Sequence, residues 1–507
     1  MLLGFVVAYL LISISIGLYA ATKVHNTKDF AVAGRHLPLP VVTATVFATW
    51  FGAEAVFGAS AAFVREGLRG VVADPFGSSL CLVLAGIFFS RYLYKLNIIT
   101  LGDFYRMRYN RTVEVITTLC IVASYLGWVA AQIKALGLIL NVVTDGALSQ
   151  EAGMVLGTAI VLTYTSFGGM LSVAVLDFVQ MAVSMAGLFF IAVVLSGKTG
   201  GAAAVISHAS AAHKFDFFPP PDPWQWITFL GAWITMMLGS IPQQDVFQRI
   251  TSAKSAKIAV GGSILGASIY FAFTFVPMFI AYSATLIDPG QYLPLLQSDD
   301  PADYQRVLPL LVMAHTPLFA QVIFFGAVLS AIMSCSSATL LAPSVSFAEN
   351  IVKGFFPGMG DHAFLRLMRF TIIGFGAVVL VFALNSQASI FKMVENAYKV
   401  TLAGAFVPLV AGAMWKRATT QGALAAILGG LSSWILVEVL VGEASAVPPQ
   451  LIGLGVSLLG MVAGSLLPQW VGRPTPLEDV HAALHHHAAA RSHHVDEHIH
   501  HHGIKKP

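Results

Sequence analysis

The sequence predicts an all-α membrane protein with about thirteen transmembrane helices. Composition is the first reason, because the 507 residues are 57% hydrophobic and only 10% charged, with a mean hydropathy of +0.77. Apolar runs close to the ~20 residues that a helix needs to cross a bilayer also recur along most of the chain. Two of these runs carry residues that interrupt a helix, which is the third observation. The composition excludes a large soluble domain, and the basic residues are not clustered as a nucleic-acid-binding surface requires.

The apolar runs define the expected spans, with ends correct to within a few residues. They cover residues 2–21, 39–64, 71–94, 113–143, 152–165, 171–195, 224–239, 259–286, 318–347, 364–384, 390–415, 422–441 and 451–470. The cysteines all fall inside apolar segments, so no disulfide framework is expected.

Lysine and arginine are unevenly distributed between alternate loops. With the N-terminus outside, the loops assigned to the cytoplasm carry about three times as many basic residues as the others, as the positive-inside rule requires. An odd number of spans then places the C-terminus in the cytoplasm. We expect a multi-pass protein of the cell (inner) membrane, with the lipid bilayer as a partner and no nucleic acid.

The first interruption lies in the run 39–64, around the sequence 46–58. Gly52 loosens the backbone at its centre, and Glu54 places a carboxylate at bilayer depth, which is costly unless it is paired or hydrated. Irregular backbone is tolerated there only when it is buried in protein or lines a polar cavity. A broken helix at Ala48–Gly52, with free carbonyl groups, is one interpretation. The other is a continuous helix with a packing face of small residues.

The second interruption is Pro242, which removes a backbone donor at the end of the run 224–239. Each interrupted run is the first of a block of five spans. Because five is odd, the second block starts on the opposite side of the membrane from the first, so the two blocks have opposite topology. Inverted blocks led by broken helices are typical of secondary transporters; the alternative is a simple kink at Pro242. The expected division is an extra helix and loop at 1–38, repeats at 39–196 and 224–415, two further helices at 416–470, and a histidine-rich tail at 471–507.

Four stretches carry a resemblance to a known family. They are TWFGAE at 49–54, YTSFGGMLSVAVLDFVQ at 164–180, IPQQDVFQR at 241–249 and GAVLSAIMSCSS at 326–337. The chain resembles the sodium:solute symporter family, and its motifs are similar in particular to the high-affinity choline transporter branch. The resemblance implies the inverted five-helix repeats of the leucine-transporter fold and sodium-coupled import of a small polar organic solute, with no enzyme activity.

The resemblance also implies a sodium site between the first broken helix and a later core helix. Its ligands would be the backbone carbonyls of Ala48, Phe51 and Ala331 and the hydroxyl of Ser334, with Cys335 where the family usually has a second hydroxyl. A thiol is a poor ligand for a hard cation, so proton coupling is the alternative.

Some members of the family use a further sodium site. The matching residues here are Asp177, Ser334 and Ser337. Without the resemblance, the serine-rich stretch reads as packing between membrane helices.

Aromatic and polar residues that match the solute site of the choline branch form a second group. They are Trp50, Gly52, Glu54, Trp128, Gln132 and Gln243. Tryptophan faces attract an organic cation, although membrane tryptophans also serve as packing residues or interfacial anchors. The solute is expected to be a choline-like amine, an amino acid or a small organic acid.

Two lysines in the apolar runs need partners. Lys134 could hold the carboxylate of a solute, but it is expected to pair with a structural carboxylate such as Glu54, the commoner fate of an intramembrane lysine. Glu395 and Lys399 are spaced i, i+4, so they are expected to pair within one helix.

The tail from residue 471 is rich in histidine, which predicts incidental binding of a divalent metal or a solvated segment without a metal role. Na+ is the expected coupling ion. A proton-coupled symporter and a sensory module of the same fold remain as alternatives.

Overall fold

The computed structural model describes residues 1–472, and these residues form helices joined by short connections, with a single isolated bridge between Leu37 and Ala253. The long helices are α1 (Leu2–Ala21), α8 (Arg111–Val143), α9 (Gln150–Ser196), α13 (Ala256–Ile287), α17 (Leu318–Asn350), α18 (Asp361–Asn385), α21 (Thr420–Leu440) and α22 (Pro449–Leu466). The shorter α-helices are α2 (Thr27–Val32), α3 (Leu39–Trp50), α4 (Ser60–Glu66), α5 (Ser78–Leu84), α6 (Ser90–Lys95), α7 (Leu101–Arg108), α10 (Ala202–Ala211), α11 (Pro223–Gly239), α12 (Gln244–Ser252), α14 (Pro289–Leu296), α15 (Pro301–Gln305), α16 (Val307–His315), α19 (Ile390–Gly404) and α20 (Phe406–Met414). Tighter or wider helical turns are η1 (Ala33–Arg35), η2 (Glu54–Ala59), η3 (Gly67–Val71), η4 (Val72–Gly77), η5 (Ala85–Phe89), η6 (Val352–Phe355) and η7 (Gly442–Ala444).

Within residues 1–472, nine helical stretches are long and apolar enough to cross a membrane, and the bent pair α19 and α20 makes a tenth. The difference from the expected thirteen has three sources. The stretch Glu54–Lys95 joins the second and third expected spans, α9 joins the fifth and sixth, and α11 has only 17 residues.

Gly169 forms the kink at which the two expected spans join within α9. This residue has φ 53° and ψ −140° inside the helix, a left-handed conformation that other residues adopt only with strain. A Cβ at this position would lie 2.4 Å from the carbonyl oxygen of Phe30. The two spans on either side of Gly169 therefore meet at a kink that requires glycine.

Polar residues at the ends of the long helices fix where they begin. The side chain of Asn110 accepts the amide of Val113 at the start of α8, and Ser255 accepts the amide of Ile258 at the start of α13. Such N-caps satisfy amides that have no partner inside the helix.

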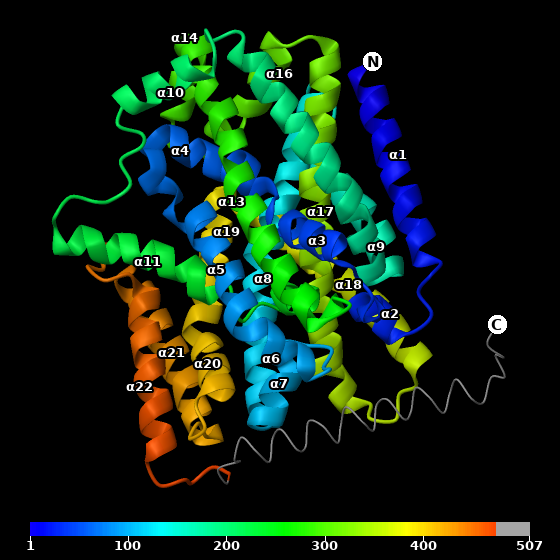
Figure 1. The fold of residues 1–507 in the computed structure, drawn as a ribbon, viewed down its shortest axis with the longest axis vertical. Coiled ribbons are helices and arrows are strands. Elements are labelled where there is room, and N and C mark those ends of the chain that lie inside the picture. The colour runs from blue at the N-terminus through cyan, green and yellow to red at the C-terminus, as the bar shows by residue number, and fades with distance from the viewer. Residues whose placement is uncertain (473–507) are drawn as a thin grey trace.

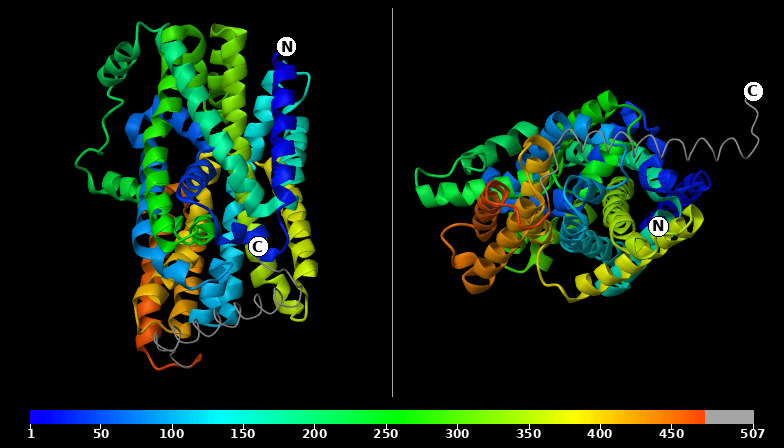
Figure 2. Two further views of the ribbon diagram at one scale, coloured as in Figure 1. Left: turned by 45° about the vertical axis from the view of Figure 1, so that its right-hand side comes forward. Right: turned by 90° about the horizontal axis from the view of Figure 1, so that it is seen from below.

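The long helices run between two ends of the molecule. The start of α1 lies at the same end as α10, α14 and α16, whereas α7 and the end of α20 lie at the other (Figure 1). The helices α21 and α22 pack together at one edge, away from α1 (Figure 2).

The first broken span lies inside this bundle. Every residue from 42 to 61 is buried, and α3 contacts α9, α13 and α17. The second broken span passes from α11 into α12, and α12 also contacts α3 and α17. The interruptions of the two runs are thus held by the same core helices.

Candidate functional site

The first broken span is interrupted at residues 51 and 52. The helix α3 ends at Trp50, Phe51 has φ −85° and ψ 80°, and helical geometry resumes at Ala53, directly before η2. The expected interruption is present, but its position within Ala48–Gly52 needs correction, because Ala48 and Trp50 are still helical. Val46 to Trp50 retain helical geometry because the break begins only where Gly52 approaches other helices closely.

Gly52 makes this close approach possible. A Cβ at residue 52 would lie 2.6 Å from Oε1 of Gln132 and 2.7 Å from both Cβ and Sγ of Cys335. No larger side chain fits between α8 and α17 without displacing one of them. Glycine therefore serves here to bring backbone against two core helices, as well as to loosen the helix.

The break leaves two carbonyls without their helical donors. In an unbroken helix the amides of Gly52 and Ala53 would donate to the carbonyls of Ala48 and Thr49. The Gly52 amide donates instead to the Trp50 carbonyl at 3.1 Å, and the Ala53 amide donates to Oε1 of Gln132 at 2.8 Å. The carbonyl of Ala48 is thus available to a cation, as carbonyls at unwound helices commonly are.

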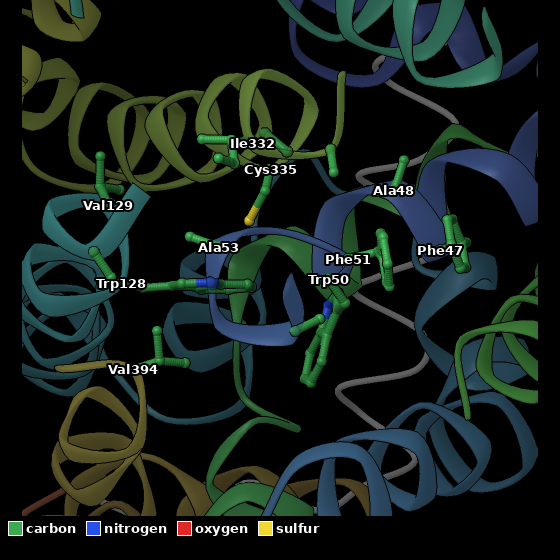
Figure 3. Close-up of a cluster of buried hydrophobic side chains, with 14 of the residues drawn as sticks. Phe47, Ala48, Trp50, Phe51, Ala53, Trp128, Val129, Ile332, Cys335 and Val394 are labelled. Atoms are coloured by element: carbon green, nitrogen blue, oxygen red, sulfur yellow. The ribbon is translucent and has the colours of Figure 1, made fainter. Parts of the chain in front are cut away.

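Glu54 lies in a ring of hydrogen-bond donors. Trp128 donates from Nε1 to Oε1 at 3.1 Å, and Gln132 donates from Nε2 to Oε2 at 2.6 Å. The thiol of Cys335 is 4.0 Å from Oε1, and its sulfur points from α17 toward Ala53 and the Trp128 ring (Figure 3). Glu54 is buried, so its carboxylate is solvated by side chains of α8.

Aromatic rings surround this carboxylate. The rings of Trp50 and Trp128 meet edge to face with centroids 5.7 Å apart, and Tyr398 of α19 contacts both, stacking on Trp50 at 6.2 Å. Tyr125 stacks on the other side of Trp128 at 5.7 Å. Four rings from three elements thus form one buried cluster, which we call the aromatic cluster.

A second carboxylate closes the aromatic cluster. Asp245, in the first turn of α12, accepts Nε1 of Trp50 at 3.0 Å and the hydroxyl of Tyr125. Its backbone amide donates to that same hydroxyl at 2.9 Å. Asp245 is fully buried. Each indole N–H of the cluster is therefore directed at a different carboxylate.

Gln243 lies at the break between α11 and α12. Its amide nitrogen donates to the hydroxyls of Ser124 and Thr401, each at 3.1 Å. The Thr401 hydroxyl in turn donates to the Gly239 carbonyl at 2.6 Å, where α11 ends. Gln243 therefore ties the second break to α8 and α19 at the border of the aromatic cluster.

A third buried carboxylate joins α9, α17 and α3. Asp177 accepts the hydroxyl of Ser334 at Oδ1 and the hydroxyl of Thr45 at Oδ2, the latter at 2.5 Å. Ser337 donates to the Ser334 carbonyl at 3.0 Å. Thr45 lies one turn before Ala48 and Thr49, so this oxygen-rich cluster borders the freed carbonyls.

The structure places the expected lysine pairs differently. Lys134 donates to the carbonyl of Ser386, and it does not pair with Glu54. Lys399 forms its ion pair with Glu438 of α21 at 3.7 Å, and not with Glu395. The expected pair of Lys399 with Glu395 was based on their spacing along one helix, and that of Lys134 with Glu54 on their depth in the membrane. In the structure, oxygen atoms of other segments lie nearer to both lysines.

Four contributors to these clusters escaped the sequence analysis, namely Thr45, Tyr125, Asp245 and Tyr398. Asp245 lies within the motif at 241–249, directly after the second break, and a carboxylate there was a usable signal. Tyr125 and Tyr398 could be found only from the packing of α8 against α19.

Among the described residues, no group of three His, Cys, Asp or Glu side chains could hold a metal ion, and the expected histidine-rich metal site at 473–507 lies outside them.

The sequence is similar to a known family and to characterised transporters. The model of the Sodium:solute symporter family matches residues 30–430. The human "High affinity choline transporter 1" is 27% identical over 442 residues, covering 85% of this chain and 75% of that protein. The "Osmoregulated proline transporter OpuE" of Bacillus subtilis is 25% identical over 507 residues, covering 92% and 94%.

Solved structures show the same fold. The substrate-bound outward-open structure of a Na+-coupled sialic acid symporter superposes with a TM-score of 0.77 at 19% identity, covering 93% of this chain and 99% of that one. The closed structure of MHP1, a nucleobase-cation-symport-1 family transporter, gives a TM-score of 0.58 at 12% identity, covering 87% and 95%. The chain therefore belongs to the sodium:solute symporter family, and it is a multi-pass membrane transporter that couples sodium to the symport of a small solute.

Proposed function

We propose that this transporter imports a small organic cation, a choline-like amine, together with Na+. The observation that carries the proposal is the aromatic cluster with its two carboxylates. Trp50 and Trp128 supply aromatic rings, while Glu54 and Asp245 supply negative charge against their indole N–H groups. Within residues 1–472 neither carboxylate forms an ion pair. A quaternary ammonium group supplies the missing positive charge and binds ring faces.

The same charges disfavour a small organic acid. Two like charges about 4 Å apart repel by roughly 4 kcal/mol at an effective dielectric constant of 20. A solute with a carboxylate group would be repelled by both Glu54 and Asp245 in the buried aromatic cluster. The acid is therefore the weakest of the three expected solute classes.

An amino acid is the second candidate, and Arg249 favours it. This arginine of α12 is buried, and its Nη1 donates to the carbonyl of Asp245 at 3.4 Å. Its Nε and Nη2 have no hydrogen-bond partner among the described residues. A zwitterion could place its ammonium group in the aromatic cluster and its carboxylate toward Arg249.

The coupling ion is proposed to bind at the first break. The carbonyls of Ala48, Phe51 and Ala331 and the hydroxyl of Ser334 would be its ligands, with Cys335 next to them. Freed carbonyls and hydroxyls suit a hard cation. The Gly52 and Ala53 amides, which do not donate to the carbonyls of Ala48 and Thr49, support this assignment.

A second sodium ion is proposed at Asp177, Ser334 and Ser337. The carboxylate already accepts hydroxyls from α3 and α17, so a cation there would hold the two helices together. Thr45, whose hydroxyl donates to Asp177, would extend the ligand set that the sequence predicted.

The orientation is proposed from charge alone. The N-terminus would lie outside and residues after α22 in the cytoplasm, because basic residues gather in the alternate loops assigned to the inside. The end of the molecule that carries α10, α14 and α16 (Figure 1) would then lie on the outer side of the cell (inner) membrane, away from the cytoplasm.

Uptake by the purified protein in proteoliposomes tests the proposal. Labelled choline, proline and a small organic acid are offered with and without an inward sodium gradient, at fixed membrane potential and pH. We expect sodium-driven uptake of choline that exceeds that of the organic acid by at least tenfold. Sodium-driven uptake of the acid alone would overturn the cation assignment, and uptake driven only by a proton gradient would overturn the sodium sites.

A further inference from the structure

A cavity of about 730 Å³ is lined by residues of three segments that lie near the candidate site, residues 58–72, 219–232 and 389–395. It lies between η3, α11 and α19, and we call it the vestibule. Its lining includes the aromatic side chains of Trp224, Phe229, Tyr304 and Phe391. Trp224 is 57% exposed. The vestibule thus combines room for a solute with one exposed aromatic side chain, whereas Phe229 is buried and the Tyr304 ring is covered by the Arg65 guanidinium at 4.7 Å.

Glu395 lines this vestibule and has no partner. The lysine one turn further along α19, Lys399, is paired with Glu438. Within the part of the chain that the structure describes, Glu395 forms no hydrogen bond or ion pair. Its side chain is half-buried, so its charge is only partly screened by water.

Two residues that line the vestibule, Gly58 and Glu395, lie within one helical turn of residues of the candidate site. Glu395 precedes Tyr398 by three residues, so the two side chains share a face of α19. Gly58 of η2 also lines the vestibule, and it follows Glu54 by four residues. A Cβ on Gly58 would lie 3.1 Å from Cβ of Phe391. Phe391 therefore packs against Gly58, one turn along the chain from Glu54.

The other charged groups of the vestibule are engaged or lie at its rim. Arg65 donates to the carbonyls of Leu296 and Ser298 at 3.0 and 2.6 Å, and Lys392 lies 3.9 Å from Glu443. Arg69 and Glu66 are exposed and of opposite sign. Glu395 is therefore the inner carboxylate without a counter-charge.

We propose that the vestibule contains an outer binding subsite for the cationic solute, in which Glu395 is the counter-charge and the exposed ring of Trp224 supplies an aromatic face. The inference rests on the proposed function, because it takes the solute to be an organic cation. A solute held there lies one helical turn from Tyr398 on α19 and from Glu54 on η2. The subsite raises the local concentration of the cation and delivers it to Trp50 and Trp128 when Phe391 moves.

Initial-rate choline uptake by proteoliposomes tests the subsite. We expect Glu395→Gln to raise the KM for choline by roughly fivefold, the size of a partly exposed ion pair, with unchanged kcat and unchanged half-saturating sodium. The matched control is Glu66→Gln, which removes the same charge from the exposed rim and should change KM by less than about twofold. Raising the ionic strength should raise KM in the wild type more than in Glu395→Gln.

The outcomes separate the two proposals. If the wild type transports choline and Glu395→Gln has the same KM, the subsite is wrong and the proposed function stands. If both variants raise KM equally, the effect is a general surface charge, and Glu395 is not a site residue. If the wild type does not bind or transport choline or related ammonium ions, the proposed function and the subsite both fail.

Discussion

The hydrogen bonds around Glu54 predict that exchanging two side chains rescues what either change alone destroys. Gln132 has two roles, since its Oε1 accepts the Ala53 amide at 2.8 Å and its Nε2 donates to Glu54 at 2.6 Å. Glu54 also accepts the indole N–H of Trp128. Three donors and three acceptors are therefore matched one to one.

The change Glu54→Gln breaks this match. A glutamine at 54 has one acceptor oxygen for two donors, so one of the donors on Trp128, Gln132 or Ala53 is left without an acceptor, however the amides are rotated. A buried unsatisfied donor costs about 1–3 kcal/mol, which corresponds to roughly 5- to 150-fold in an equilibrium constant. The loss of the carboxylate charge adds to this for a cationic solute.

The double variant Glu54→Gln with Gln132→Glu restores every pair. The new glutamine accepts from Trp128 and donates to the new glutamate, which also accepts the Ala53 amide. Gln132→Glu alone places two carboxylates against each other and should be destabilising. We expect the double variant to recover thermal stability and choline KM to within a few-fold of the wild type, with a coupling energy of about 1–3 kcal/mol.

Thermal unfolding in detergent and choline uptake kinetics measure the cycle. A double variant no more stable than the worse single variant would refute the hydrogen-bond assignment. An unchanged choline KM in Glu54→Gln would refute the contribution of its charge to binding.

Three further changes test the sodium sites and the kink. Ser334→Ala should abolish the sodium dependence of uptake with normal membrane insertion, whereas Ser336→Ala, whose hydroxyl only donates to the Ile332 carbonyl of its own helix, should not; equal sodium dependence in both would remove Ser334 from the ligand set. Cys335→Ser should lower the half-saturating sodium concentration by roughly fivefold, because a hydroxyl oxygen is a better ligand for a hard cation than sulfur, and an unchanged value would assign the thiol to packing alone. Gly169→Ala should lower the free energy of unfolding by about 2 kcal/mol or more, measured by thermal melting against Gly326→Ala, where a Cβ meets nothing within 4 Å.

The architecture could be predicted because bilayer thickness and helix-breaking residues leave clear patterns. The interruptions at Gly52 and Pro242 were visible, since few other reasons place such residues in long apolar runs. The length of the break was not, because α3 continues to Trp50 until contact with Gln132 and Cys335 stops it. That contact joins positions far apart in the chain.

The polar networks were harder to predict than the helices. Lys399 and Glu395 have ideal spacing for a pair, yet Glu438 of another helix takes the lysine. A buried charge takes whichever partner packing brings near, and sequence spacing describes only the partners on its own helix. The same limit hid Thr45, which contacts Asp177 only because α3 crosses α9.

The buried charges offer a physical reason why solute and sodium enter together. Glu54, Asp177 and Asp245 are buried carboxylates, and Arg249 interacts electrostatically with the last two. One guanidinium cannot balance three carboxylates, and uncompensated charge is costly away from water. A sodium ion at Asp177 and an organic cation at Glu54 would each neutralise a different carboxylate.

The helix α3 supplies the mechanical link between those two positions. Thr45 ties it to Asp177, the carbonyl of Ala48 does not accept its usual helical donor, the Gly52 amide, and Trp50 and Glu54 follow within six residues. Sodium bound at the end of α3 would fix the turn at Gly52 before the solute arrives. The solute would then bind to a cluster that is already ordered, so less of its binding energy would be lost in ordering the turn. On this basis sodium should lower the solute Kd, and by thermodynamic linkage the solute should tighten sodium binding by the same factor.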